Sequence, residues 1–190
     1  MSPSNLNGFR FLGERVRHEG FFFRLVTGTF LDPKGYTFER EIIRHPGAVC
    51  VVALEGESPS ILMVRQYRAA IDAFLLEIPA GKLDIEDEPV ALAASRELEE
   101  EVGRRATRWT ELGSFLNSPG FTDETTTAFL AEGLTSVTPD AHGIEEEYMS
   151  IVPIPLHDFW RLVRNGEIID AKSIIAVTCA ERVLAARLGS

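Results

Sequence analysis

The sequence predicts an α/β (α+β) fold: a mixed sheet covered by helices on its faces, with a small N-terminal antiparallel β unit before it. Residues 21–29 and 36–43 alternate apolar and polar side chains around a Pro-Gly turn at 32–35, which predicts a strand, a turn and a returning strand. Residues 48–54 are almost purely apolar, as in a strand buried on both faces. Residues 89–103 repeat apolar side chains at three- and four-residue steps, which predicts an amphipathic helix.

The remaining elements follow in chain order. His45-Pro46-Gly47 interrupts the pattern, so we expect the β unit over residues 1–46 and the main domain over 47–190. Pro89 suits the first turn of the predicted helix, and Gly103 suits the position just beyond its end. Further strands are expected at 61–67, 111–117, 125–132 and 148–154, and two closing helices at 157–165 and 173–188.

Composition narrows the class of partner. The 190 residues include 19 Lys and Arg against 29 Asp and Glu, a net charge of 19 − 29 = −10. Without a cationic excess to displace counterions from phosphates, a general nucleic-acid binder is disfavoured. A small anionic ligand remains compatible, because a few arginines suffice to bind one diphosphate.

Cysteine usage and hydropathy predict a cytoplasmic protein. Cys50 and Cys179 each lie in an apolar run, which predicts buried free thiols in a reducing compartment. The N-terminal twenty residues lack the apolar core of a signal peptide, and no apolar run approaches the length of a membrane span. We therefore expect no membrane partner.

Three carboxylates share one face of the predicted helix. Glu97, Glu100 and Glu101 are spaced three and four residues apart, and like charges at that spacing destabilise an isolated helix. A divalent cation reverses this effect, since carboxylate-rich sites suit Mg²⁺ or Mn²⁺. The alternative is a solvated acidic face in which Arg96 pairs with Glu100. The Gly-containing turn at 76–83 favours the metal, because it can bring a backbone carbonyl next to the carboxylates.

This stretch resembles the Nudix box, G-x5-E-x7-R-E-U-x-E-E-x-G-U, where U is a bulky aliphatic residue. Gly81, Glu88 and residues 96–103 fill its positions, with two departures. One extra residue lies between Gly81 and Glu88, which we place in the loop at 84–87, where it is tolerated. Arg104 replaces the last aliphatic residue, at the helix exit. The resemblance implies a Nudix hydrolase with an α/β/α sandwich.

Within the box, the resemblance implies two to three Mg²⁺ (or Mn²⁺) ions per site. Their ligands would be the carbonyl of Ala80 and the carboxylates of Glu97, Glu100 and Glu101. Arg96 would support these carboxylates and Glu88 would help to fix the loop. Glu99 points away from this face and is expected to be solvated.

Outside the box, three segments resemble the ADP-ribose pyrophosphatase branch: 66–68 (Gln-Tyr-Arg), 77–81 (Glu-Ile-Pro-Ala-Gly) and 118–124 (Ser-Pro-Gly-Phe-Thr-Asp-Glu). Pro119 stands sixteen positions after Gly103, a separation that tracks with ADP-ribose preference in that family. The resemblance extends roughly from residue 20 to 176. It implies hydrolysis of a small nucleoside diphosphate, ADP-ribose, to AMP and ribose 5-phosphate.

The same resemblance assigns substrate contacts. Arg68 would bind the diphosphate, Arg40 and Glu41 the substrate, Phe21 the adenine and Glu124 a ribose hydroxyl. In such enzymes the N-terminal unit exchanges between two subunits, so a homodimer is implied in which Phe21 and Arg40 serve the partner's site. Phe21 fits packing equally well, and Arg40 fits a surface ion pair equally well.

For the general base, the resemblance indicates the acidic loop at 138–147. Glu145 is the predicted base, with Glu147 as an auxiliary metal ligand and Glu146 as the alternative base. A mobile solvated loop is the competing interpretation, and His142 fits a surface position.

Other functions remain open at this stage. The substrate could be a GDP-hexose or a dinucleoside polyphosphate. A sensor that binds ADP-ribose without turnover is the alternative from a different class, but such proteins generally carry damaged box carboxylates and a DNA-binding domain. The intact carboxylates favour an enzyme.

Overall fold

A computed structural model describes residues 8–138 and 148–189, which form two compact units. Of the described residues, the first unit comprises 8–47 and 116–125, and the second comprises 48–115, 126–138 and 148–189. The grouping of residues 116–125 with the N-terminal strands has no counterpart in the sequence pattern.

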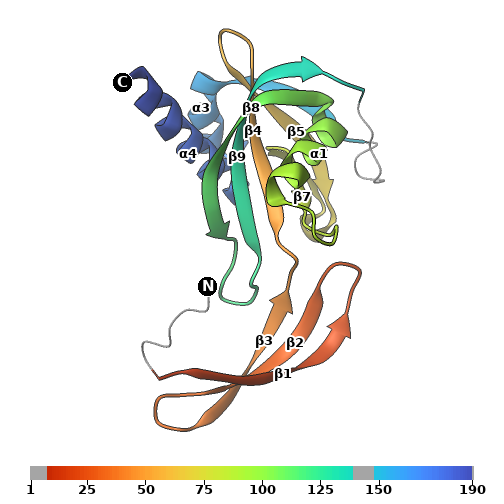
Figure 1. Ribbon diagram of the computed structural model, residues 1–190, viewed down its shortest axis with the longest axis vertical. Coiled ribbons are helices and arrows are strands. Elements are labelled where there is room, and N and C mark those ends of the chain that lie inside the picture. Colours follow the sequence, from red (N-terminus) through yellow and green to blue (C-terminus); the bar gives the residue numbers. More distant parts are fainter. Residues whose placement is uncertain (1–7, 139–147, 190) are drawn as a thin grey trace. The chain divides into compact units, whose positions relative to one another are not determined.

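The first unit is a three-stranded antiparallel sheet in the order β1 (Arg10–Glu19), β2 (Arg24–Leu31), β3 (Thr37–Arg44) (Figure 1). The Asp32 carboxylate accepts the backbone N–H groups of Lys34 and Tyr36, which fixes the turn between β2 and β3. The predicted antiparallel β unit is therefore confirmed. Strand β1 was not predicted, because its side chains are mostly exposed and show no apolar alternation.

The second unit is built on a seven-stranded sheet. Its strands are β4 (Ala48–Glu55), β5 (Ser60–Arg68), β6 (Ala73–Glu77), β7 (Ala80–Lys82), β8 (Arg104–Leu116), β9 (Thr125–Ser136) and β10 (Ser150–Pro155). The main order is β10-β5-β4-β9-β8, with β6 paired to β5 and β7 paired to β4. Because β4 and β9 run parallel while β4 is antiparallel to β5 and β7, the sheet is mixed, as predicted.

Helices cover both faces of this sheet (Figure 1). They are α1 (Val90–Val102), α3 (Phe159–Arg164) and α4 (Ala171–Leu188), with short 3-10 turns at Ala69–Ile71 and Leu156–Asp158. Alternate residues of β4 point to opposite sides: Cys50 and Val52 enter the core with α3 and α4, whereas Val49 and Val51 enter the core with α1. The predicted α/β/α sandwich is confirmed.

The ends of α1 follow the sequence signals. Gly103 adopts a left-handed conformation (φ 62°) and donates its N–H to the carbonyls of Glu99 and Leu98, which ends the helix. Pro89 lies one position before the first helical residue. Cys50 is buried and Cys179 half-buried, both as free thiols, and burial raises the pKa of Cys50 to about 12.

Two helices and several strands differ in extent from the prediction. The helix expected at 157–165 begins as a 3-10 turn, and the strand expected at 111–117 begins seven residues earlier, at Arg104. Strands β6 and β7 were not predicted, since they are short and flank Pro79. Among the described residues, no helix combines the length and apolar character needed to cross a membrane.

We expect Leu98→Ala to lower the free energy of unfolding by about 2 to 5 kcal/mol, because Leu98 is fully buried between α1 and the sheet and its loss leaves a cavity. Leu92→Ala on the same helix is the matched control. Its side chain is 60% exposed, so a change of no more than about 0.5 kcal/mol is expected. Urea unfolding measures both, and equal losses would contradict the assigned buried face of α1.

Candidate active site

Helix α1 carries the three predicted carboxylates on one side, and two of them, Glu97 and Glu101, face strand β7. Glu97 and Glu101 are 9% and 7% exposed, which is rare for glutamate unless its charge is compensated. Glu100, one turn from Glu97, is half-buried. The same helix buries its apolar face in the core, so the carboxylates are held in place by packing rather than by attraction to one another.

The turn before the helix lies directly against these carboxylates. Ala80 donates its backbone N–H to Oε2 of Glu101 at 3.0 Å. A Cβ atom placed on Gly81 would lie 1.8 Å from Cδ of Glu97, so only glycine leaves room for that carboxyl group. The backbone is held there because β7 pairs with β4, with Gly81 opposite Val49.

Arg96 holds the carboxylates from the other side. Its guanidinium bonds Glu88 at 3.1 Å and both Glu97 and Glu100 at 2.9 Å. These contacts, that of Glu88 first, raise the pKa of Arg96. The pair of Arg96 with Glu100, which the sequence offers as the alternative to a metal site, is therefore present, and Arg96 contacts Glu97 at the same time. Within these four side chains the charge is 1 − 3 = −2.

A divalent cation fits this arrangement. In residues 8–138 and 148–189, no group of three Asp, Glu, His or Cys side chains is already arranged to hold a metal ion. Glu97 and Glu100 each turn an oxygen toward Arg96, and Glu101 turns one toward Ala80. Each carboxylate oxygen has more than one lone pair, so an oxygen that accepts a hydrogen bond can also bind a cation. The charge excess, the oxygen donors and the space at Gly81 suit Mg²⁺ or a similar hard ion.

The prediction that Glu99 is solvated is wrong in detail. Glu99 does point away from the other carboxylates, but it is half-buried and forms a two-bond ion pair with Arg105, at 2.9 and 2.7 Å. This pair lowers the pKa of Glu99. Arg104, the departure at the end of the box, similarly pairs with Glu55 at the end of β4 at 2.6 Å.

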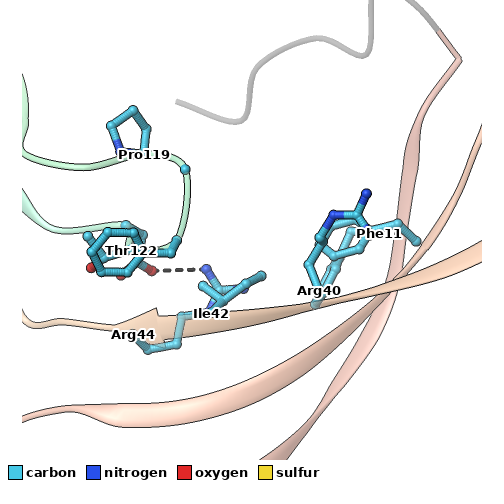
Figure 2. Close-up of a pocket in the computed structure, with 10 residues that line it drawn as sticks. Phe11, Arg40, Ile42, Arg44, Pro119 and Thr122 are labelled. Atoms are coloured by element: carbon cyan, nitrogen blue, oxygen red, sulfur yellow. Dashed lines mark hydrogen bonds and ion pairs between the residues drawn. The ribbon is translucent and has the colours of Figure 1, made fainter.

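The first unit contains a separate cavity of about 440 Å³ (Figure 2). Arg40 and Phe11 line it from the strands, and Pro119 and Thr122 line it from the 116–125 segment (Figure 2). The guanidinium of Arg40 lies 4.8 Å from the ring centre of Phe38 and donates to the carbonyl of Glu39. Among the described residues Arg40 forms no ion pair, and both roles predicted for it stay predictions.

The other predicted substrate contacts of this unit are accessible. Phe21 is fully exposed, which does not support the packing alternative. Glu41 is exposed on β3, and Glu124 is half-buried. The segment that carries Glu124 is attached to β3, because the Asp123 carboxylate accepts from Arg44 at 3.0 Å and from the backbone of His45 at 2.9 Å.

The predicted base and its alternatives, Glu145, Glu146 and Glu147, lie outside the described residues, as does His142.

Residues 44–174 match the NUDIX domain model. The chain belongs to the Nudix family. It is 41% identical over 145 residues to the ADP-ribose pyrophosphatase of Bacillus subtilis, covering 76% of this chain and 77% of that protein. It is 38% identical over 176 residues to the ADP-ribose pyrophosphatase of Mycobacterium tuberculosis, covering 92% and 84%. The crystal structure of an ADP compounds hydrolase has the same fold, with a TM-score of 0.83 at 20% identity and 97% and 98% coverage.

In this Nudix protein, Arg68 has a partner that sequence reasoning missed. Its Nε and Nη2 atoms donate to the two oxygens of Glu77 at 2.7 and 2.8 Å. An arginine at the end of an apolar strand needs an anionic partner, and Glu77 of the same chain supplies part of the negative charge. The hydrogen bonds and charge of Glu77 raise the pKa of Arg68.

Glu77 also binds Lys172, and neither residue was predicted to contribute to the site. Burial alone raises the pKa of Glu77, but its hydrogen bonds and ion pairs with Arg68 and Lys172 outweigh that effect, so its pKa lies below the ordinary 4.5. The sequence held a signal for Glu77, as a charged residue at the end of the apolar run 74–76. It held none for Lys172, which lies 95 residues away.

We expect Glu77→Gln to destabilise the protein at pH 7 by about 3 to 5 kcal/mol, because Arg68 and Lys172 lose a buried counter-charge. A lowered pKa means that Glu77 contributes stability above pH 4.5, and that this contribution is lost as the pH falls through the folded-state pKa. The stability difference between wild type and Glu77→Gln should therefore shrink from pH 7 toward pH 3 in urea titrations. A constant difference would contradict the ion pairing.

Proposed function

We propose that this Nudix enzyme hydrolyses the diphosphate of ADP-ribose to AMP and ribose 5-phosphate, with a divalent cation as cofactor. The observation that carries the chemistry is the set of nearly buried carboxylates on α1 against the Ala80–Gly81 turn. The names of the two relatives support ADP-ribose as the substrate.

We further propose Mg²⁺ (or Mn²⁺), two to three ions per site, held by the carboxylates of Glu97, Glu100 and Glu101 and the carbonyl of Ala80. Bound divalent cations would neutralise phosphate oxygens and promote ionisation of the attacking water. Arg96 keeps Glu97 and Glu100 oriented, and Glu88 holds Arg96 through two hydrogen bonds.

Arg68 is the proposed diphosphate ligand. Its side chain is 39% exposed, whereas its partner Glu77 is 1% exposed, so part of the guanidinium faces outward. Arginine suits phosphate because its planar group donates two parallel hydrogen bonds. Its ion pair with Glu77 fixes that plane before the substrate arrives, which lowers the entropy lost on binding.

The residues proposed for the nucleoside lie in the first unit. Phe21 would stack on adenine, Arg40 and Glu41 would contact the substrate, and Glu124 would bind a ribose hydroxyl. We propose a homodimer in which Phe21 and Arg40 serve the second copy. A cytoplasmic location is proposed on the two free thiols, Cys50 and Cys179.

The proposed reaction is attack of water on one phosphorus, with cleavage of its bond to the bridging oxygen. Glu145 is the proposed base that takes the proton from this water, with Glu146 as the alternative and Glu147 as an auxiliary ligand. The leaving phosphate oxygen is one of the groups that Arg68 would stabilise.

We expect release of AMP from ADP-ribose in the presence of Mg²⁺, measured by chromatography. The comparison panel contains a GDP-hexose and a dinucleoside polyphosphate, each assayed with Mg²⁺ and then with Mn²⁺. A higher kcat/KM for either comparison substrate would replace ADP-ribose as the assignment. Binding of ADP-ribose without turnover under both ions would indicate a sensor instead.

Replacing Glu101 with Gln should lower kcat by about 100-fold, because a carboxylate that contacts the Ala80 turn and is proposed to hold the ion loses its charge. Glu99→Gln is the matched control on the same helix. It breaks only an ion pair with exposed Arg105, so its kcat should change by no more than about twofold. Similar losses in both variants would refute the assigned catalytic face of α1.

A further inference from the structure

A chain of alternating charges runs from the start of α4 to Arg68. Asp170 pairs with Lys172 at 3.1 Å, Lys172 pairs with Glu77, and Glu77 pairs with Arg68. Asp170 is itself fixed, because its side chain accepts the backbone N–H of Ser173 as the N-cap of α4. The network therefore starts at a helix end packed in the core.

Exposure changes sharply along this network. The side chains of Glu77, Lys172 and Asp170 are 1%, 15% and 14% exposed, whereas Arg68 is 39% exposed. The ion pairs are thus shielded from water except at the arginine. Shielded pairs with several hydrogen bonds hold their geometry more firmly than surface pairs do.

The same helix start also fixes the backbone that leads into the Nudix box. Ile78 donates its N–H to Oγ of Ser173 at 2.9 Å, and Val51 donates its N–H to the carbonyl of Pro79 at 2.9 Å. Ala80 then bonds Glu101. Each residue from Glu77 to Ala80 is therefore held by a different neighbour, and two of these four contacts, those of Lys172 and Ser173, come from α4.

We infer that Lys172 is a positioning residue for the active centre, acting through Glu77 to hold the guanidinium of Arg68 in place for the diphosphate. This inference rests on the proposed function for the identity of the ligand. Lys172 acts without contacting the substrate itself. It shares the charge of Glu77, so that Arg68 is not the sole counter-ion of a buried carboxylate and part of its charge remains effective toward an anion.

The first test is independent of substrate. The Nε–H group of Arg68 donates to Glu77, so its ¹⁵N NMR signal reports how rigidly the guanidinium is held. Lys172→Met should shift this signal and lower its heteronuclear NOE, and Lys172→Arg, which restores a cation, should return both toward the wild-type values. An unchanged Arg68 signal in Lys172→Met would overturn the inference. If this variant fails to fold, Lys172→Gln replaces it.

The second test uses kinetics with ADP-ribose. Loss of a residue that orients a binding group should act on affinity, so Lys172→Met should raise KM by about tenfold and change kcat by no more than about twofold. In a double-mutant cycle, Lys172→Met should add almost nothing to Arg68→Ala, since both act through one guanidinium. Additive losses would mean that Lys172 serves only stability.

Arg187→Met is the matched control. Arg187 shares the carboxylate of Glu132 with Arg108, both at 2.6 Å, so the same kind of ion pair is broken. Glu132 follows Ala131, the partner of Ala53, and therefore lies about 17 Å along the sheet from the level of Gly81. The KM of Arg187→Met should stay at the wild-type value. A tenfold rise would contradict a specific effect of Lys172 through Arg68. Absence of turnover by wild type would refute the proposed function, while the NMR comparison would still decide the role of Lys172.

Discussion

The close contact between the Gly81 backbone and the Glu97 carboxyl group is the constraint on which the site depends. No side chain fits between them, because a Cβ atom would lie 1.8 Å from Cδ of Glu97. The contact requires that the turn and the helix be held from outside. The pairing of β7 with β4 holds the turn, and burial of the apolar face of α1 holds the helix.

This arrangement separates stability from charge on a single helix. Ala93, Ala94, Leu98 and Val102 are fully buried on one face of α1. The neighbouring side of the helix gathers Glu97, Glu100 and Glu101, whose mutual repulsion would weaken the helix in isolation. Arg96 relieves only part of this repulsion, since its guanidinium pairs with Glu97 and Glu100 and is shared with Glu88 as well. Core packing therefore maintains a carboxylate cluster whose remaining charge suits a cation.

The sequence predicted the parts of this structure that depend on local pattern. The α1 helix, its end at Gly103, the buried strand β4 and the pairing of Arg96 with Glu100 all follow from spacing within a few residues. It did not predict β1, whose exposed side chains carry no alternation, or the pairing of Glu77 with Lys172. Such a pairing depends on tertiary packing between residues far apart in the chain, which periodicity does not encode. For Arg68 the sequence predicted the need for an anion but not that Glu77 meets part of it.

The residues proposed for chemistry and those proposed for recognition differ in what fixes them. Glu97, Glu101 and Arg68 lie on the sheet and helices of one unit, and packing and ion pairs within that unit fix their geometry. Phe21, Arg40 and Glu41 lie at exposed positions of the other unit, where no core packing restricts the side chain. Substitutions there cost little folding energy. Substrate preference can therefore change within the family while the box stays the same. The box identifies the reaction, and the residues proposed for recognition in the first unit are the place to look for the substrate.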